Sequence, residues 1–231
     1  MPTTITYLSH SAVMIQRGPV TLLIDPFITG NPAATAKASD LKPTHIAVSH
    51  GHADHLGDTV ELAKRTGATV FCNFELGEHI MAQGVKAVEQ FNPGGQVKTA
   101  FGFIACTKAF HSSSIDGTGK YMGQPNGIIA HFNADAAASA FTAYHCGDTD
   151  LFGDMALIGE IYKPDVAFIP IGDRYTMGPM LATRAAQLIK PRVAVPIHYN
   201  TWPPIEVDVR EFAPRGVEVR VLKPGEAWRV S

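Results

Sequence analysis

The feature that most constrains this fold is a run of β-forming residues, 44–49, that leads directly into the segment His50-Gly51-His52-Ala53-Asp54-His55. Three imidazoles and one carboxylate within six residues serve no apolar packing, because polar groups this dense must be solvated, hydrogen-bonded or bound to something. Neutral imidazole and carboxylate are ligands of zinc and other borderline divalent ions. The small spacers Gly51 and Ala53 let the loop fold tightly. The stretch therefore predicts a metal site at the end of a strand.

Further candidate ligands follow other runs that are typical of buried strands. In sheets covered by helices, ligands collect where strands end and loops converge. We therefore expect these side chains to meet the His-rich segment at one rim of the fold. They are Asp25 after 22–24, His111 after 103–110, Asp148 after 141–144 and His198 after 193–197.

The order of the expected elements indicates the fold class. Strand–helix alternation at both ends of the chain flanks a meander-like centre, with no fixed-period repeat and no linker. This pattern predicts an α/β protein with two sheets face to face and helices outside, in a single domain spanning 1–231. Expected strands cover 4–8, 12–16, 19–24, 44–49, 68–72, 97–99, 101–109, 127–132, 140–145, 166–171, 193–197, 217–222 and 227–230.

Helix starts and stops are expected from capping residues. Asp58 with Glu61 three residues later has the pattern of a capping box, and Gly67 closes that helix. Asn73 is expected to cap a second helix that stops at Gly84. Further helices are expected over 154–162, after Pro179 and briefly from Asp208, and 111–127 is expected to be a Ser/Gly-rich loop.

Composition and charge exclude several classes of function. With 231 residues, 45% of them hydrophobic and 17% charged, the chain can bury a substantial core. A formal net charge of −2 without a Lys/Arg run argues against long nucleic acid as a partner. The N-terminus lacks the pattern of a signal peptide, and no stretch approaches the ~18 apolar residues of a membrane span. Cys72, Cys106 and Cys146 lie in apolar runs, so we expect reduced thiols in a cytoplasmic protein.

His-x-His-x-Asp-His after a strand resembles the signature of the metallo-β-lactamase fold superfamily of metal-dependent hydrolases. The resemblance implies a four-layer αββα sandwich of two mixed β-sheets. It also implies two divalent metal ions, with zinc favoured by the nitrogen-rich ligands and manganese or iron as alternatives. Carried over by position, the first ion is held by His50, His52 and His111, the second by Asp54, His55 and His198, and Asp148 bridges the two.

Within the superfamily, several motifs indicate the branch. His50-x-His52 differs from the His-x-Glu of flavodiiron proteins, so hydrolysis is favoured over redox chemistry. From residue 4 to 230 the chain is similar to compact cytoplasmic metal-dependent hydrolases related to the ascorbate-6-phosphate lactonases, although Asp150 stands where that branch has glycine. The shared motifs are Tyr-Leu-Ser-His-Ser at 7–11, Ile-Asp-Pro-Phe at 24–27, Ala-Phe-His-Ser at 109–112, Gly-Asp-Thr-Asp-Leu-Phe at 147–152 and the segment 170–179.

The remaining polar candidates are interpreted by position. His10 is expected either at the mouth of the site or as a satisfied histidine near the core. Asp25 either accepts the remaining N–H of a ligand histidine or is a turn residue before Pro26. Arg174 and Tyr175 are candidates for holding an anionic group of the substrate. His131 and His145 alternate with apolar residues and are expected to fill a sheet face.

The resemblance implies a mechanism in which a hydroxide between two ions attacks a small ester, lactone or related substrate. Asp54 would orient this hydroxide while binding the second ion, and Asp148 would hold the ions together. Two alternatives stay open: a phosphodiesterase acting on a small nucleotide or lipid-like substrate, and a metal-dependent sensor without catalysis. The expected partner is a small molecule, anionic if Arg174 and Tyr175 hold it, and self-association into a homo-oligomer is left open.

Overall fold

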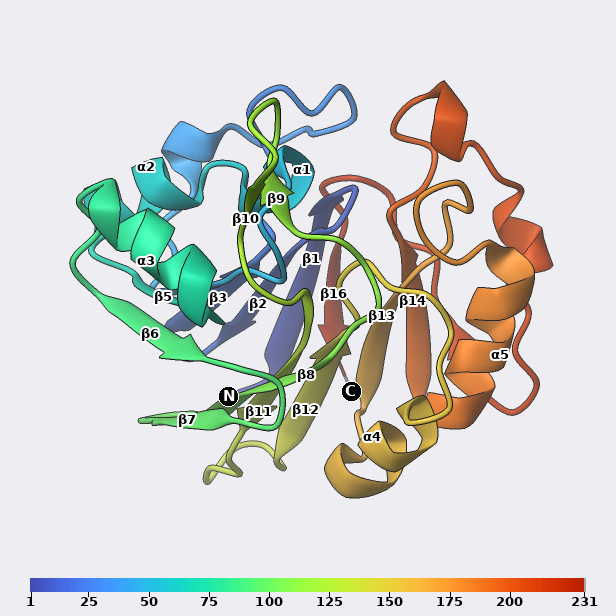
Figure 1. The fold of residues 1–231 in the computed structure, drawn as a ribbon. Coiled ribbons are helices and arrows are strands. Elements are labelled where there is room, and N and C mark those ends of the chain that lie inside the picture. The colour runs from blue at the N-terminus through green and yellow to red at the C-terminus, as the bar shows by residue number, and fades with distance from the viewer. Residues whose placement is uncertain (231) are drawn as a thin grey trace.

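The computed structural model describes residues 1–230, and its chain forms two seven-stranded sheets packed face to face (Figure 1). Helices α2 (Thr59–Thr66) and α3 (Phe74–Ala82) cover the outer face of one sheet, and α4 (Met155–Tyr162) and α5 (Pro179–Ile189) cover the outer face of the other. This is the predicted four-layer αββα sandwich. In the described part of the chain, no helix is long and apolar enough to cross a membrane.

The first sheet has the order β16-β1-β2-β3-β4-β5-β6. It is antiparallel from β16 to β3 and parallel from β3 to β6, so the ends of β3 and β4 lie at the same edge. Its strands are β1 (Thr3–Ser9), β2 (Ala12–Arg17), β3 (Val20–Ile24), β4 (His45–Ala47), β5 (Thr69–Asn73), β6 (Val88–Phe91) and β16 (Ala227–Val230).

The second sheet has the order β15-β14-β13-β12-β11-β8-β7. It is parallel from β12 to β15 and antiparallel from β12 to β7. Its strands are β7 (Gln96–Thr99), β8 (Gly102–Lys108), β11 (Asn126–Phe132), β12 (Phe141–His145), β13 (Val166–Pro170), β14 (Val193–Ile197) and β15 (Glu218–Val219). A separate two-stranded hairpin consists of β9 (Ser114–Ile115) and β10 (Lys120–Tyr121).

The α-helices lie in the connections between neighbouring parallel strands. Asn73 caps α3, as predicted, because its side chain accepts a hydrogen bond from Leu76 N at 2.9 Å. The α-helices are α1 (Ala53–Leu56), α2 (Thr59–Thr66), α3 (Phe74–Ala82), α4 (Met155–Tyr162) and α5 (Pro179–Ile189). Short 3₁₀ turns are η1 (Ala38–Asp40), η2 (Pro203–Ile205) and η3 (Val209–Glu211).

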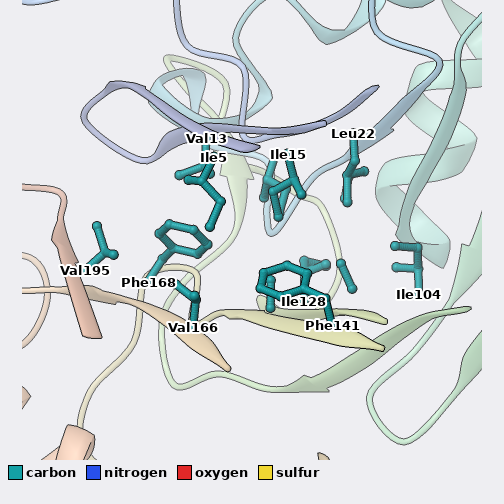
Figure 2. Packing of buried hydrophobic residues seen from close by; sticks show 14 of the residues in the cluster. Ile5, Val13, Ile15, Leu22, Ile104, Ile128, Phe141, Val166, Phe168 and Val195 are labelled. Atoms are coloured by element: carbon teal, nitrogen blue, oxygen red, sulfur yellow. The ribbon is translucent and has the colours of Figure 1, made fainter. Parts of the chain in front are cut away.

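The central core lies between the two sheets. Side chains alternate across a strand, so Val13 and Ile15 of β2 face the opposite sheet, whereas Met14 packs on the helix side. Each fully buried side chain of this kind contributes about 1.5–3 kcal/mol. Figure 2 shows the two inner faces meeting, with Ile5, Val13, Ile15 and Leu22 from the first sheet and Ile104, Ile128, Phe141, Val166, Phe168 and Val195 from the second.

Several sequence-based expectations were wrong in detail. Asp58 does not cap α2 with its side chain; instead its carboxylate accepts hydrogen bonds from the N–H groups of Ile28 and Thr29, at 3.0 and 2.8 Å. The capping-box pattern failed because a loop distant in sequence supplies better-placed donors. Strand β6 and helix α1 were not predicted, the expected loop 111–127 contains the β9–β10 hairpin, and 217–222 contributes only Glu218–Val219.

The contact between α4 and α5 depends on Gly159, because a Cβ there would collide with the carbonyl oxygen of Ile189. Alanine favours a helix over glycine by about 1 kcal/mol, but it cannot move a backbone carbonyl. We expect Gly159→Ala to lower the free energy of unfolding by about 1–3 kcal/mol, measured by urea denaturation of metal-free protein. Gly153→Ala is the matched control, since a Cβ at Gly153 has open space; equal effects of the two substitutions would contradict this packing.

Candidate metal centre

Polar side chains from both sheets converge at one rim of the sandwich. From the first sheet, Asp25 follows β3, His50 and His52 follow β4, and the short helix α1 carries Asp54 and His55. From the second sheet, His111 follows β8, Asp148 follows β12 and His198 follows β14. Each side chain therefore stands where a strand ends, as the sequence indicated.

Asp25 is fully buried and bonds Ser49, just before the His-rich segment, and His55 at its end. Its Oδ1 accepts a hydrogen bond from Ser49 N at 2.7 Å. Its Oδ2 accepts from Ser49 Oγ at 2.6 Å and lies 2.8 Å from His55 Nδ1. Asp25 thus accepts from a histidine ring of the cluster, which is the first of the two roles considered for it.

These bonds determine where two imidazoles carry their protons. A carboxylate only accepts, so His55 donates from Nδ1 and, when neutral, keeps a lone pair on Nε2. Ser49 Oγ gives its single hydrogen to Asp25, so it must accept from His50 Nδ1, 3.0 Å away. The neutral His50 ring therefore also presents a bare Nε2. Ser49 was not recognised from the sequence, because nothing in its type marks it as a link between two side chains.

A buried carboxylate stands opposite the bare nitrogen of His55. Asp148 Oδ1 lies 3.3 Å from His55 Nε2, yet neither atom has a hydrogen-bond partner among the described residues. Asp148 Oδ2 lies 3.0 Å from His198 Nε2. A lone pair and a carboxylate facing each other in a buried site repel unless positive charge lies between them. A metal ion ligated by both groups supplies that charge.

The protonation equilibria reflect the same demand for positive charge. Burial alone would lower the pKa of His198, but Asp148 and Asp54 raise it to about 9. Burial opposes charge on His55 as well, and the surrounding carboxylates nevertheless raise its pKa well above the ordinary value. The pKa of Asp148 lies well below its ordinary range, because His198 and His55 outweigh the effect of burial. Without a metal ion, protons on these two imidazoles supply the charge.

The candidate ligand atoms form three groups that share residues, and within each group the atoms lie within 4.8 Å of one another. One group is all imidazole, and in it His50 Nε2 lies 2.9 Å from His52 Nδ1. Burial lowers the pKa of His50 and of His111, which favours the neutral ring that a metal requires. The groups are His50, His52 and His111; His50, His55 and Asp148; and His10, Asp54, His55 and His198.

The other predicted site residues fall in different places. His10 is fully buried beside Asp54, with 3.1 Å between His10 Nε2 and Asp54 Oδ2. Arg174 and Tyr175 are exposed, and the guanidinium carbon lies 5.7 Å from the centre of the Tyr175 ring. Within residues 1–230, no hydrogen bond or ion pair joins either of these two side chains to the clustered histidines and aspartates.

His145 does more than fill a sheet face, which is all that the sequence indicated. It is fully buried, its Nε2 lies 2.9 Å from the carbonyl oxygen of Ser11, and its Nδ1 accepts from Gly147 N at 3.1 Å. His145 thereby ties the turn after β1 to the loop that carries Asp148. His131, in contrast, is half-buried, stacks on Phe103 and bonds Thr142 away from the rim.

Comparison with known proteins shows the family to which the chain belongs. The beta-lactamase superfamily domain matches residues 21–199. A UPF0173 metal-dependent hydrolase of Methanopyrus kandleri is 44% identical over 232 aligned residues, covering 97% of this chain and 98% of the relative. One from Geobacillus thermodenitrificans is 48% identical over 229 residues, with 96% and 98% covered.

Solved structures extend the comparison to three dimensions. Igni18, described as a novel metallo hydrolase from the archaeon Ignicoccus hospitalis, has a TM-score of 0.88 at 37% identity, covering 100% of this chain and 99% of that one. The metallo-beta-lactamase fold protein YhfI from Bacillus subtilis has a TM-score of 0.72 at 17% identity, which shows a shared fold. The chain therefore belongs to the UPF0173 family of metal-dependent hydrolases within the metallo-β-lactamase superfamily.

Proposed function

We propose that the whole chain acts as one hydrolase domain that cleaves a small ester or lactone at a centre of two divalent ions. The observation that carries the proposal is the buried pair of His55 Nε2 and Asp148 Oδ1, which face each other at 3.3 Å without a hydrogen bond. The first subsite consists of His50, His52 and His111, the second subsite consists of Asp54, His55 and His198, and Asp148 is shared.

The bound ions would lower the pKa of a shared water toward ~7 and polarise the bond under attack. The protein's own contribution is to hold these ligands and to leave one side of the centre open. Asp148 and His198 have side chains only 3% and 2% exposed, whereas Asp54 is 26% and His111 16% exposed. Substrate therefore approaches past Asp54 and His111, where the Asp54 carboxylate can orient the attacking water.

The substrate class rests on the branch that the sequence resembles. Motifs shared with hydrolases related to the ascorbate-6-phosphate lactonases favour carbon–oxygen ester cleavage of a small, anionic molecule. Arg174 and Tyr175, which are both exposed, are the candidates for holding such an anion. Zinc suits the imidazole-rich first subsite, with manganese or iron as alternatives.

Elemental analysis tests the metal content directly. We expect protein purified without chelator to approach two ions per chain, zinc foremost, because each subsite offers three protein ligands besides the shared Asp148. The loaded protein should hydrolyse members of a lactone and ester panel faster than bis(p-nitrophenyl) phosphate. A preference for the phosphodiester would favour phosphodiesterase chemistry instead, and metal content near zero after reconstitution would refute the proposal.

Substitutions separate catalysis from simple metal storage. Asp148→Asn removes the shared charge, so both ions should bind more weakly and hydrolysis should fall by at least ~100-fold, the order seen when a key electrostatic group is lost. His198→Ala affects the second subsite alone, so one ion should remain while activity drops. His131→Ala lies away from the rim and should leave metal content unchanged. Metal loss in His131→Ala together with full activity in His198→Ala would show the ligand assignment to be wrong.

Metal binding should release protons near neutral pH. The pKa of His198 is about 9 in the metal-free site, so at pH 7.5 its ring carries a proton that an ion must displace. Apparent metal affinity should therefore rise as the pH is raised from 7 to about 9. Calorimetry of Zn²⁺ binding in buffers of different ionisation enthalpy measures the released protons; His198→Ala should release fewer, and an affinity independent of pH between 7 and 9 would contradict the mechanism.

A further inference from the structure

The turn after β1 places His10 against the second subsite through both its side chain and its backbone. His10 Nε2 lies 3.1 Å from Asp54 Oδ2, and His10 Nδ1 lies 2.9 Å from Thr201 Oγ1. The carbonyl oxygen of His10 accepts a hydrogen bond from His198 N at 2.8 Å. One residue thus touches two of the three ligands that distinguish the second subsite.

The Asp54 carboxylate selects the form of the His10 ring, and the Thr201 hydroxyl is compatible with that form. An ionised Asp54 only accepts, so His10 must carry a proton on Nε2 to bond it. A neutral imidazole then has a lone pair on Nδ1, and Thr201 donates its hydroxyl hydrogen to that atom. Thr201 therefore satisfies Nδ1 in the tautomer that donates to Asp54.

Packing holds the His10 ring in place. Trp202 stacks on it with the ring centres 4.9 Å apart and the planes at 26°, and Phe27 meets it edge-on at 5.8 Å. The backbone of His10 is left-handed, with φ +57°, and Tyr7 Oη donates to its carbonyl oxygen at 3.1 Å. The side chain is fully buried, so rotating it away would leave polar atoms without partners.

The same contacts argue that His10 is not itself a ligand, although its ring belongs to the group of ligand atoms from His10, Asp54, His55 and His198. A metal ligand needs a free lone pair directed at the ion. Nε2 uses its proton on Asp54, and the Nδ1 lone pair is taken by Thr201. Both ring nitrogens are engaged, and the nitrogen facing the centre is a donor.

We propose that His10 is a positioning residue of the second subsite: it orients the Asp54 carboxylate by a hydrogen bond to Oδ2, the oxygen that lies 3.7 Å from His198 Nε2, and fixes the His198 backbone through its carbonyl oxygen. The inference rests on the proposed two-ion centre. It predicts that His10 controls occupancy of the second subsite and leaves the first unaffected.

Two substitutions separate the contacts of the ring. His10→Gln places an amide N–H at about the reach of Nε2 and can still bond Asp54. His10→Asn tolerates the left-handed backbone, but its side chain is too short to reach Asp54, so it keeps only the hydrogen bond with Thr201. Loss of a hydrogen-bond partner behind a ligand typically costs about 10- to 100-fold in metal affinity. We expect a loss of that size for His10→Asn, whereas His10→Gln retains most of the affinity.

Single-subsite backgrounds assign the loss to one ion. His111→Ala leaves the second subsite, His198→Ala leaves the first, and Zn²⁺ is titrated into each apoprotein against a chromophoric chelator. Adding His10→Asn should weaken binding in the His111→Ala background and leave it unchanged in the His198→Ala background. In the His111→Ala background, Thr201→Val should also weaken binding and Thr201→Ser should restore it.

Each contrary outcome has a distinct meaning. Equal weakening in both backgrounds would indicate a merely structural role for His10 and overturn the inference, as would unchanged affinity in the His111→Ala background. A loss in His10→Gln as large as in His10→Asn would overturn the donor role. Wild-type protein that binds fewer than two ions would instead refute the proposed function, and the inference with it, before any His10 variant is compared.

Discussion

His55 Nε2 and Asp148 Oδ1 face each other at 3.3 Å in a buried site, and Asp25 determines which nitrogen of His55 carries the proton. Because Asp25 accepts the proton on His55 Nδ1, the nitrogen toward Asp148 is a lone pair unless the ring is charged. Burying negative charge is costly without a compensating cation. The centre therefore binds metal ions or retains protons, and the raised pKa values of His55 and His198 describe the second state.

The two sheets contribute different ligands, so the centre exists only while they keep their mutual position. The apolar core sets the distance between the sheets, and hydrogen bonds between loops at the rim hold the two sheets in position relative to each other. Asn126 N donates to Ser49 O at 3.0 Å, His145 Nε2 lies 2.9 Å from Ser11 O, and His198 N donates to His10 O at 2.8 Å. Ser49 adjoins His50, His198 is itself a proposed ligand, and His145 precedes the loop that carries Asp148, so a shift of either sheet would disturb the ligands.

The sequence predicted the layers and the strand ends because both follow from local patterns: apolar runs, alternation, and a His or Asp just beyond a strand. It could not predict which polar side chains bond each other. Asp58 has the pattern of a helix cap yet binds the loop at 28–29, and Ser49 links Asp25 to His50 across 24 residues of sequence separation. The role of His145 could not be predicted, because its hydrogen-bond partners, Ser11 O and Gly147 N, are backbone atoms that any residue type would supply.

Backbone strain gives a further indication of what the rim requires. His10, Asp25 and His198 all have positive φ, between 47° and 57°, a conformation that glycine adopts without cost. Such residues cost about 1–3 kcal/mol each and persist where the surroundings over-determine them. Gly147, beside Asp148, takes the same conformation as glycine because no side chain is needed there, and a Cβ would meet Asn126 O. At His10, Asp25 and His198 the chain instead has an imidazole or a carboxylate, so the contacts of these side chains offset the cost of the strained backbone.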